Sequence, residues 1–152
     1  GHSGGGFAAA DAIMRYPEFY DVAVSQAGNH DNRNYEDDWG EKWQGLLEVY
    51  PDGTTNYDNQ ANHLLAGNLE GKLLIAHGTL DSNVPPSNTM LVVNALIDAN
   101  KDFDLIMMPN RSHGLGNEPY MMRRRWDYFV RHLLGAEPPE GYEIGQLRRP
   151  IR

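Results

Sequence analysis

Short apolar runs alternate along the chain with stretches of helical periodicity, and this alternation predicts the secondary structure. A strand that is covered on both faces is apolar at nearly every position. Three such runs predict buried strands, at residues 21–28, 72–77 and 103–108. Helices are predicted at residues 6–14, at residues 57–66, after Pro85-Pro86, and at residues 118–134. This order is typical of the α/β class with a parallel sheet.

Two of the predicted helices have apolar residues at helical spacing, which predicts their buried faces. After Pro85-Pro86 the predicted face consists of Met90, Val93, Leu96 and Ile97. In the last helix it consists of Met122, Trp126, Phe129, Val130 and Leu133. Gly135 ends this helix. We therefore expect a domain at residues 1–135 and an irregular tail of the same domain at residues 136–152.

The segment between the first strand and the second predicted helix, residues 29–56, is polar and contains Tyr35, Trp39 and Trp43. A long loop that contains aromatic residues is more often a functional surface than a core. Its acidic residues are a candidate cation site or a solvated loop, and we favour the loop; they are Glu36, Asp37, Asp38 and Glu41. No bound metal is expected.

Composition excludes several classes of function. The chain has 152 residues, 40% of them hydrophobic, which is enough for the core of one domain. Its formal net charge of −8 argues against a nucleic-acid partner, because phosphate binding needs a basic face. Cysteine is absent, so neither a disulfide nor a thiol nucleophile can form. No stretch approaches the ~20 apolar residues of a membrane span.

The first five residues, Gly1-His2-Ser3-Gly4-Gly5, read G-x-S-x-G, the nucleophile elbow of α/β-hydrolases. In this motif a serine lies on a sharp turn between a strand and a helix, and side chains at the flanking glycines would collide with backbone. The N–H of the next residue, here Gly4, points to where an oxyanion would form. The same letters also suit a flexible linker or a cloning remnant, so the motif alone does not decide.

Asp81 and His113 each follow a predicted strand, and the order Ser3, Asp81, His113 is that of the α/β-hydrolase triad. Histidine would take the serine proton, and aspartate would hold the imidazole in the required tautomer. The alternatives are that Asp81 only caps its turn and that His113 is an ordinary surface histidine. His77, at the end of its strand, is expected to be packed and hydrogen-bonded.

Two features indicate that the chain is the C-terminal portion of an α/β-hydrolase fold whose N-terminal strands lie outside it. An elbow needs a strand before its first glycine, and Gly1 begins the sequence. A parallel sheet of only three strands would also leave its edges open.

Three segments together resemble the prolyl oligopeptidase family, and within it the dipeptidyl peptidase IV branch. They are residues 1–7 (GHSGGGF), residues 77–84 (HGTLDSNV) and residues 112–114 (SHG). The resemblance implies that Ser3 is the nucleophile, His113 the base and Asp81 its orienting carboxylate. It also implies that the Gly4 N–H gives half of the oxyanion hole, and that a tyrosine hydroxyl upstream of this chain gives the other half.

The resemblance further implies a substrate site. Asn83 matches a position that contacts the substrate backbone, and Tyr35 and Trp39 match aromatics that line the S1 pocket. Trp39 stands where tyrosine is usual, and the alternative is that both aromatics simply pack on the domain. Family members join this domain to an N-terminal β-propeller and cleave short peptides, often after Pro or Ala, without a cofactor. A periplasmic or secreted location and a homodimer are further expectations.

Three functional hypotheses follow. The first is a serine peptidase, with exopeptidase or endopeptidase action left open. The second is an esterase that uses the same triad. The third is a packing or interaction module without catalysis. We expect the isolated chain to be inactive, because it lacks the nucleophile strand, the second oxyanion donor and the propeller.

Overall fold

The computed structural model describes residues 1–145, which form an α/β fold around a three-stranded parallel sheet. The strands lie in the order β1 (Val22–Gln26), β2 (Lys72–Gly78) and β3 (Asp104–Met108). Ala23 is opposite Leu73, and Ile75 is opposite Leu105. The predicted fold class and all three predicted strands are therefore confirmed.

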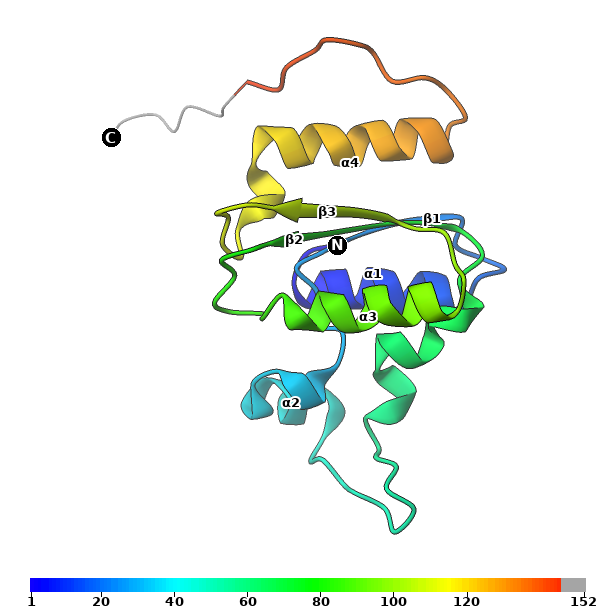
Figure 1. Cartoon of the computed structure of the whole chain (residues 1–152), viewed down its shortest axis with the longest axis vertical. Helices are drawn as coiled ribbons and strands as arrows, with labels where there is room; N and C mark the ends of the chain where they lie inside the picture. The colour runs from blue at the N-terminus through cyan, green and yellow to red at the C-terminus, as the bar shows by residue number, and fades with distance from the viewer. Residues whose placement is uncertain (146–152) are drawn as a thin grey trace.

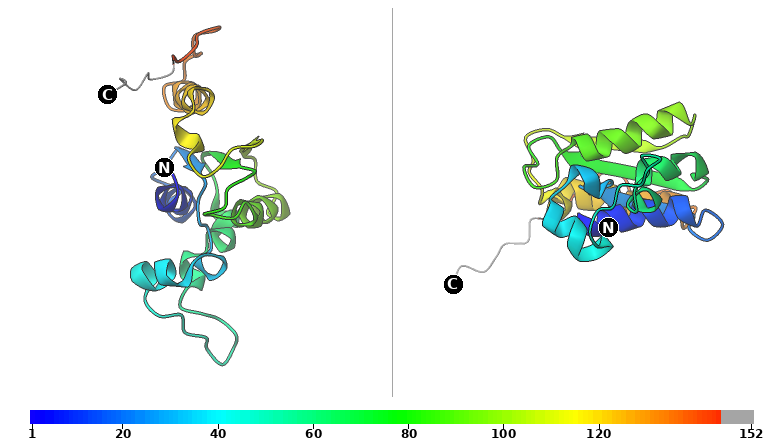
Figure 2. Two further views of the ribbon diagram at one scale, coloured as in Figure 1. Left: turned by 90° about the vertical axis from the view of Figure 1, so that its left-hand side faces the viewer. Right: turned by 90° about the horizontal axis from the view of Figure 1, so that it is seen from below.

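Helices cover both faces of the sheet (Figures 1 and 2). α1 (Gly4–Arg15) and α3 (Ser87–Asp98) lie on one face, and α4 (Pro119–His132) lies on the other. Successive side chains of a strand point to opposite faces. Leu73 and Ile75 accordingly pack into the core on the α1 and α3 side, and Leu74 and Ala76 into the core on the α4 side. This explains why the central strand is apolar at each position from Leu73 to Ala76.

The predicted face of α3 is wrong at two of its four residues. Met90 and Ile97 are 38% and 61% exposed, whereas Asn88 and Thr89 are fully buried together with Val92 and Leu96. The two polar residues are buried because they form hydrogen bonds there. The Asn88 amide binds the backbone of the segment after β1, and Thr89 binds a histidine of β2. Apolar periodicity cannot anticipate a helix face that is partly polar.

The predicted face of α4 is also wrong in part. Trp126 and Leu133 are 48% and 58% exposed, and the fully packed residues are Met121 and Tyr128. The Tyr128 hydroxyl donates to the Asp104 carboxylate at the start of β3, at 3.0 Å. This contact turns the helix so that Tyr128, and not Trp126, faces the sheet.

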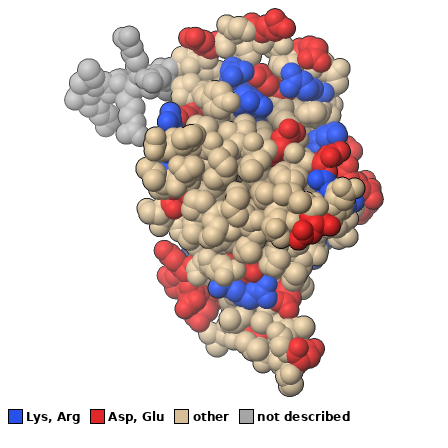
Figure 3. Space-filling view, viewed as in Figure 1, with Lys and Arg blue, Asp and Glu red and all other residues tan. Residues whose placement is uncertain are grey.

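Residues 29–68 fold differently from the prediction. The expected loop at 29–56 contains a 3-10 turn, η1 (Asn32–Asn34), and a helix, α2 (Asp37–Gln44), over which acidic side chains gather in Figure 3. Two acidic residues in the first turn of α2 favour a helix there. The expected helix at 57–66 is instead two 3-10 segments, η2 (Asp58–Gln60) and η3 (Asn62–Asn68). The Asp58 carboxylate accepts from the Thr55 N–H and hydroxyl, which favours a turn.

Beyond α4, residues 136–145 contain neither a helix nor a strand. The rest of the expected irregular tail, residues 146–152, lies outside the described residues. A further 3-10 turn, η4 (Leu115–Asn117), connects β3 to α4.

His30 should make the stability of the fold depend on pH. It is fully buried, and burial lowers its pKa to about 3, since the charged imidazolium would lose its hydration. Its stabilising effect is complete above the unfolded pKa of about 6.5 and is lost as the pH falls below that value. Between pH 7.5 and pH 5 we expect His30 to lower the free energy of unfolding by about 2 kcal/mol.

Chemical denaturation of the wild type and of His30→Gln at both pH values tests this expectation. The free energy of unfolding should change between the two pH values by about 2 kcal/mol less in His30→Gln than in the wild type, whatever the absolute stability of the variant. His132→Gln, on α4, is the matched control and should keep the wild-type difference. Equal differences for the wild type and His30→Gln would contradict the assignment.

Candidate active site

Ser3 lies on a strained turn that joins a strand-like segment to α1. His2 forms a parallel bridge with Gln26 of β1, and the Ser3 N–H donates to the Gln26 carbonyl at 2.8 Å. Ser3 itself has φ 56° and ψ −126°, a conformation that a non-glycine residue rarely adopts. Such strain costs on the order of 1–3 kcal/mol and is common at functional sites. The helix begins at the very next residue.

Two glycines of this turn are required by close packing of the backbone. A Cβ atom at Gly1 would lie 1.9 Å from the Gly5 carbonyl oxygen, and one at Gly6 would lie 2.5 Å from the Gln26 carbonyl oxygen. A Cβ atom at Gly5 would meet no neighbouring atom within 4 Å. The expectation that the second glycine of the motif prevents a collision is therefore wrong, because the close approach occurs one residue later.

The Gly4 N–H belongs to the first turn of α1, where backbone donors have no partner within the helix. No backbone carbonyl of residues 1–145 accepts a hydrogen bond from it. The N-terminal end of the helix dipole also favours negative charge there. The Gly4 N–H can therefore bind an oxygen that becomes negative beside Ser3.

Asp81 lies in the turn after β2 and is 6% exposed. Its Oδ1 accepts from the backbone N–H groups of Asn83 and Val84, at 2.9 and 3.0 Å. Its Oδ2 lies 2.7 Å from His113 Nδ1 and 3.1 Å from His77 Nε2. Four contacts fix the orientation of the carboxylate, so Asp81 caps its turn and contacts His113 at the same time.

His77 is buried and hydrogen-bonded, as predicted, and it also contacts Asp81, which the sequence did not indicate. Its Nε2 lies near two acceptors, the Val84 carbonyl at 3.0 Å and the Asp81 carboxylate, so this nitrogen carries the hydrogen. The Thr89 hydroxyl, 2.7 Å from Nδ1, then donates. Burial lowers the pKa of His77, which favours this neutral form. His77 therefore contacts the same carboxylate oxygen, Oδ2, as His113.

His113 presents one nitrogen to Asp81, which fixes its tautomer. Because a carboxylate only accepts, Nδ1 carries the hydrogen and Nε2 is left as an acceptor. The His2 ring lies 4.7 Å from the His113 ring. Burial lowers the pKa of His2. Both Ser3 and His113 are described, and no hydrogen bond joins them in this structure. Catalytic hydrogen bonds are often long before substrate binds.

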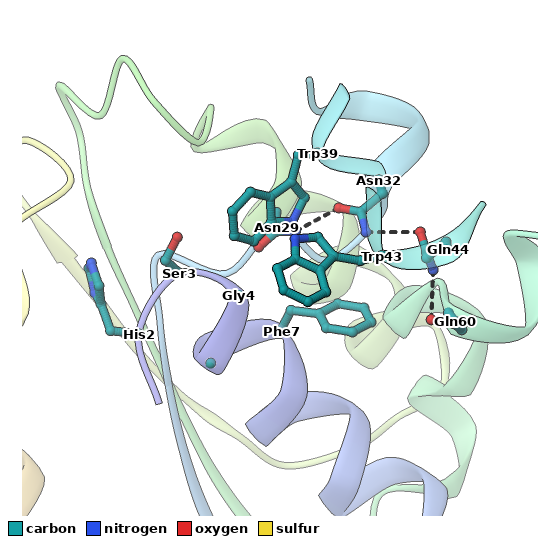
Figure 4. Close-up of a pocket in the computed structure, with 11 residues that line it drawn as sticks. His2, Ser3, Gly4, Phe7, Asn29, Asn32, Trp39, Trp43, Gln44 and Gln60 are labelled. Carbon is teal, nitrogen blue, oxygen red and sulfur yellow. Dashed lines mark hydrogen bonds between the residues drawn. The ribbon is translucent and has the colours of Figure 1, made fainter. Parts of the chain in front are cut away.

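A cavity of about 460 Å³ opens beside Ser3 (Figure 4). The residues that line it are His2, Ser3, Gly4, Gly5, Phe7, Asn29, Asn32, Trp39, Trp43, Gln44 and Gln60. The Trp39 and Trp43 rings are 5.7 Å apart on α2. The resemblance indicated Trp39 for this wall, and Trp43 was noted only as an aromatic residue of the same expected loop. Nothing in the sequence indicated Phe7 or the four carboxamides.

Tyr35 and Asn83, the other two predicted substrate-binding residues, do not line this cavity. They contact each other instead, with the Tyr35 hydroxyl 2.6 Å from the Asn83 amide oxygen. The Asn83 N–H also donates to Asp81, so this pair lies next to the carboxylate.

Within residues 1–145, no group of three or more His, Asp or Glu side chains is arranged to hold a metal ion. In the same residues, no helix has both the length and the apolar character needed to span a membrane.

The parallel sheet, the strained serine turn and the Asp81–His113 pair at the carboxyl ends of the strands define part of an α/β-hydrolase. Residues 1–136 match the prolyl oligopeptidase family, and the chain belongs to this family.

Relatives that the chain resembles include dipeptidyl peptidases. It is 31% identical over 134 residues to dipeptidyl peptidase family member 1 of Caenorhabditis elegans, covering 86% of this chain and 16% of that protein. It is 33% identical over 100 residues to dipeptidyl peptidase 4 of Trichophyton rubrum, a match that covers 64% of this chain and 12% of that protein.

A solved structure of a putative dipeptidyl aminopeptidase IV from Bacteroides ovatus superposes with a TM-score of 0.78 at 29% identity, covering 87% of this chain and 18% of that one. The solved structure of Porphyromonas gingivalis dipeptidyl peptidase 4 superposes with a TM-score of 0.72 at 28% identity. This match covers 83% of this chain and 18% of that one. The chain thus spans less than a fifth of the length of these relatives.

Proposed function

We propose that this chain carries the catalytic triad of a serine peptidase, with Ser3 as nucleophile, His113 as general base and Asp81 as its orienting carboxylate. The observation that supports the proposal best is the 2.7 Å contact between Asp81 and His113 Nδ1. This contact gives the imidazole the tautomer in which Nε2 can accept a proton. The same ring lies 4.7 Å from the ring of His2, the residue before Ser3.

The reaction would proceed in two halves. The Ser3 oxygen attacks a peptide carbonyl carbon while His113 Nε2 takes the hydroxyl proton, and the oxygen that becomes negative binds the Gly4 N–H. His113 then gives the proton to the leaving amine, and the C–N bond breaks. Water attacks the resulting acyl-enzyme by the same route and releases the acid.

The substrates we propose are short peptides, cleaved after Pro or Ala, as the family resemblance implies. Trp39 lines the cavity beside Ser3, and its indole would contact such a small apolar side chain. We further propose that the chain acts within the larger architecture of its relatives, which would supply the second oxyanion donor and a propeller that excludes large proteins.

A substrate panel tests this proposal in the longer polypeptide within which we propose that the chain acts. We expect Xaa-Pro and Xaa-Ala arylamides to be hydrolysed with higher kcat/KM than short acyl esters of the same leaving-group reactivity. Preferential hydrolysis of the esters would favour an esterase instead. Hydrolysis of neither class by a folded sample would contradict the proposal.

The 152-residue chain alone should hydrolyse the same arylamides at least ~10²–10³-fold more slowly, since loss of one oxyanion donor typically costs that much. Circular dichroism would establish that the chain is folded in this assay. Turnover equal to that of the longer polypeptide would show that the donors within residues 1–145 suffice.

A further inference from the structure

Four carboxamide side chains from three segments of the chain form a continuous row along the cavity beside Ser3. The Asn29 amide lies 2.6 Å from the Asn32 oxygen, the Asn32 amide 2.9 Å from the Gln44 oxygen, and the Gln44 amide 2.8 Å from the Gln60 oxygen. Figure 4 shows the row beginning at Asn29, the member drawn nearest Ser3, and running away from it to Gln60. All four residues line the cavity.

The row has a direction. Each member donates an N–H to the oxygen of the next, so the orientation of one amide fixes that of its neighbour. The oxygen of Asn29, at the Ser3 end of the row, accepts no hydrogen bond from another member of the row. This atom is buried and has no hydrogen-bond partner within residues 1–145, and Asn29 as a whole is 1% exposed. Such an acceptor is rare in a folded protein, and it favours a ligand that brings a donor.

The cavity wall is uncharged as far as the described residues show, since it contains no Asp, Glu, Lys or Arg. An ammonium or carboxylate that entered would lose its hydration without gaining an opposite charge. The wall also contains Phe7, Trp39 and Trp43, which suit an apolar stem. The volume of about 460 Å³ equals that of roughly 15 water molecules in the liquid, far more than a proline ring fills.

We propose that this cavity binds a neutral side chain that ends in an N–H donor, of the glutamine type, on the residue whose carbonyl Ser3 attacks. The carboxamide of the substrate donates to Asn29 Oδ1, and its methylene groups lie against the indoles. The remaining N–H groups of the row can bind its oxygen, because each amide has two N–H groups, and Asn29, Asn32 and Gln44 each use one of them within the row. The inference rests on the proposed function and widens its substrate class beyond Pro and Ala.

Dipeptide arylamides that differ only in the residue before the cleaved bond test the inference in the longer natural polypeptide. Glutamine and methionine have unbranched side chains of similar length, and only glutamine carries a donor. We expect kcat/KM to be roughly 10–100-fold higher for the glutamine substrate than for the methionine substrate. The glutamate substrate should be poorer than both, since it brings a charge and no donor.

Asn29→Leu keeps the shape of the side chain and removes its oxygen, so the glutamine-to-methionine ratio should fall to 1 or below. Asn94→Leu, on the exposed face of α3, is the matched control and should keep the wild-type ratio. If Asn29→Leu does not fold, the wild-type ratio alone decides. A wild-type ratio near 1, with Ala or Pro substrates hydrolysed, overturns this inference and leaves the proposed function standing. Failure to hydrolyse any arylamide overturns both.

Discussion

Ser3→Ala is expected to reduce peptide turnover by roughly 10⁶-fold and to abolish labelling by a fluorophosphonate probe. The loss should be this large because in the proposed mechanism the Ser3 hydroxyl forms the covalent bond, and no other group at the turn can replace it. Alanine lacks only that oxygen, and no hydrogen bond from the Ser3 hydroxyl is formed within residues 1–145. The fold and the thermal unfolding midpoint should therefore change little.

The measurement is arylamide kinetics on the longer natural polypeptide, with mass spectrometry to locate the probe. Ser87→Ala is the matched control, since Ser87 is exposed at the start of α3, and it should keep wild-type turnover and labelling. Labelling of folded Ser3→Ala at the wild-type rate would mean that another residue is the nucleophile.

Asp81→Asn is expected to lower kcat by about 10⁴-fold, the loss that follows when the histidine of such a triad takes the wrong tautomer. The asparagine oxygen can still accept from the N–H groups of Asn83 and Val84, which bind Oδ1 in the wild type. Its NH₂ group would then face His113 Nδ1. The imidazole can accept that hydrogen only by carrying its own on Nε2, where it cannot take the serine proton.

Proton NMR of the histidine ring N–H groups reports the tautomer directly. We expect a downfield His113 Nδ1–H signal in the wild type and none in Asp81→Asn. Asp102→Asn, at an exposed position before β3, should retain both the signal and wild-type kcat. An Asp81→Asn variant with the signal lost but kcat unchanged would show that Asp81 has no role in the reaction.

The strands were predictable because β2 is covered on both faces. Leu73, Leu74, Ile75 and Ala76 are all fully buried, and such a run leaves a clear apolar signal in the sequence. α2 was not predictable in the same way, because its helix is short, polar and stabilised by local charge. The faces of α3 and α4 were only partly predictable, because polar contacts of Asn88, Thr89 and Tyr128 help to set which side meets the sheet.

For the candidate site, the residue types and their order along the chain indicated Ser3, Asp81 and His113, since each follows a strand or a turn signal. Nothing in the spacing indicated that His77 would share the Asp81 oxygen with His113. The His77 contact depends on how the turn after β2 folds back, and the His113 contact depends on how β2 and β3 pair. The row from Asn29 to Gln60 was not predictable either, since its members come from three segments that meet only in the folded structure.

The sequence by itself determined the class of the fold, the family and the chemical types at the site, because apolar periodicity and short motifs are local properties. The tertiary structure decided which groups meet: the imidazole of His113 with the carboxylate of Asp81, and the four carboxamides with one another. Hydrogen bonds act only over about 3 Å. Partners far apart in sequence are therefore fixed only once the sheet and its loops have packed.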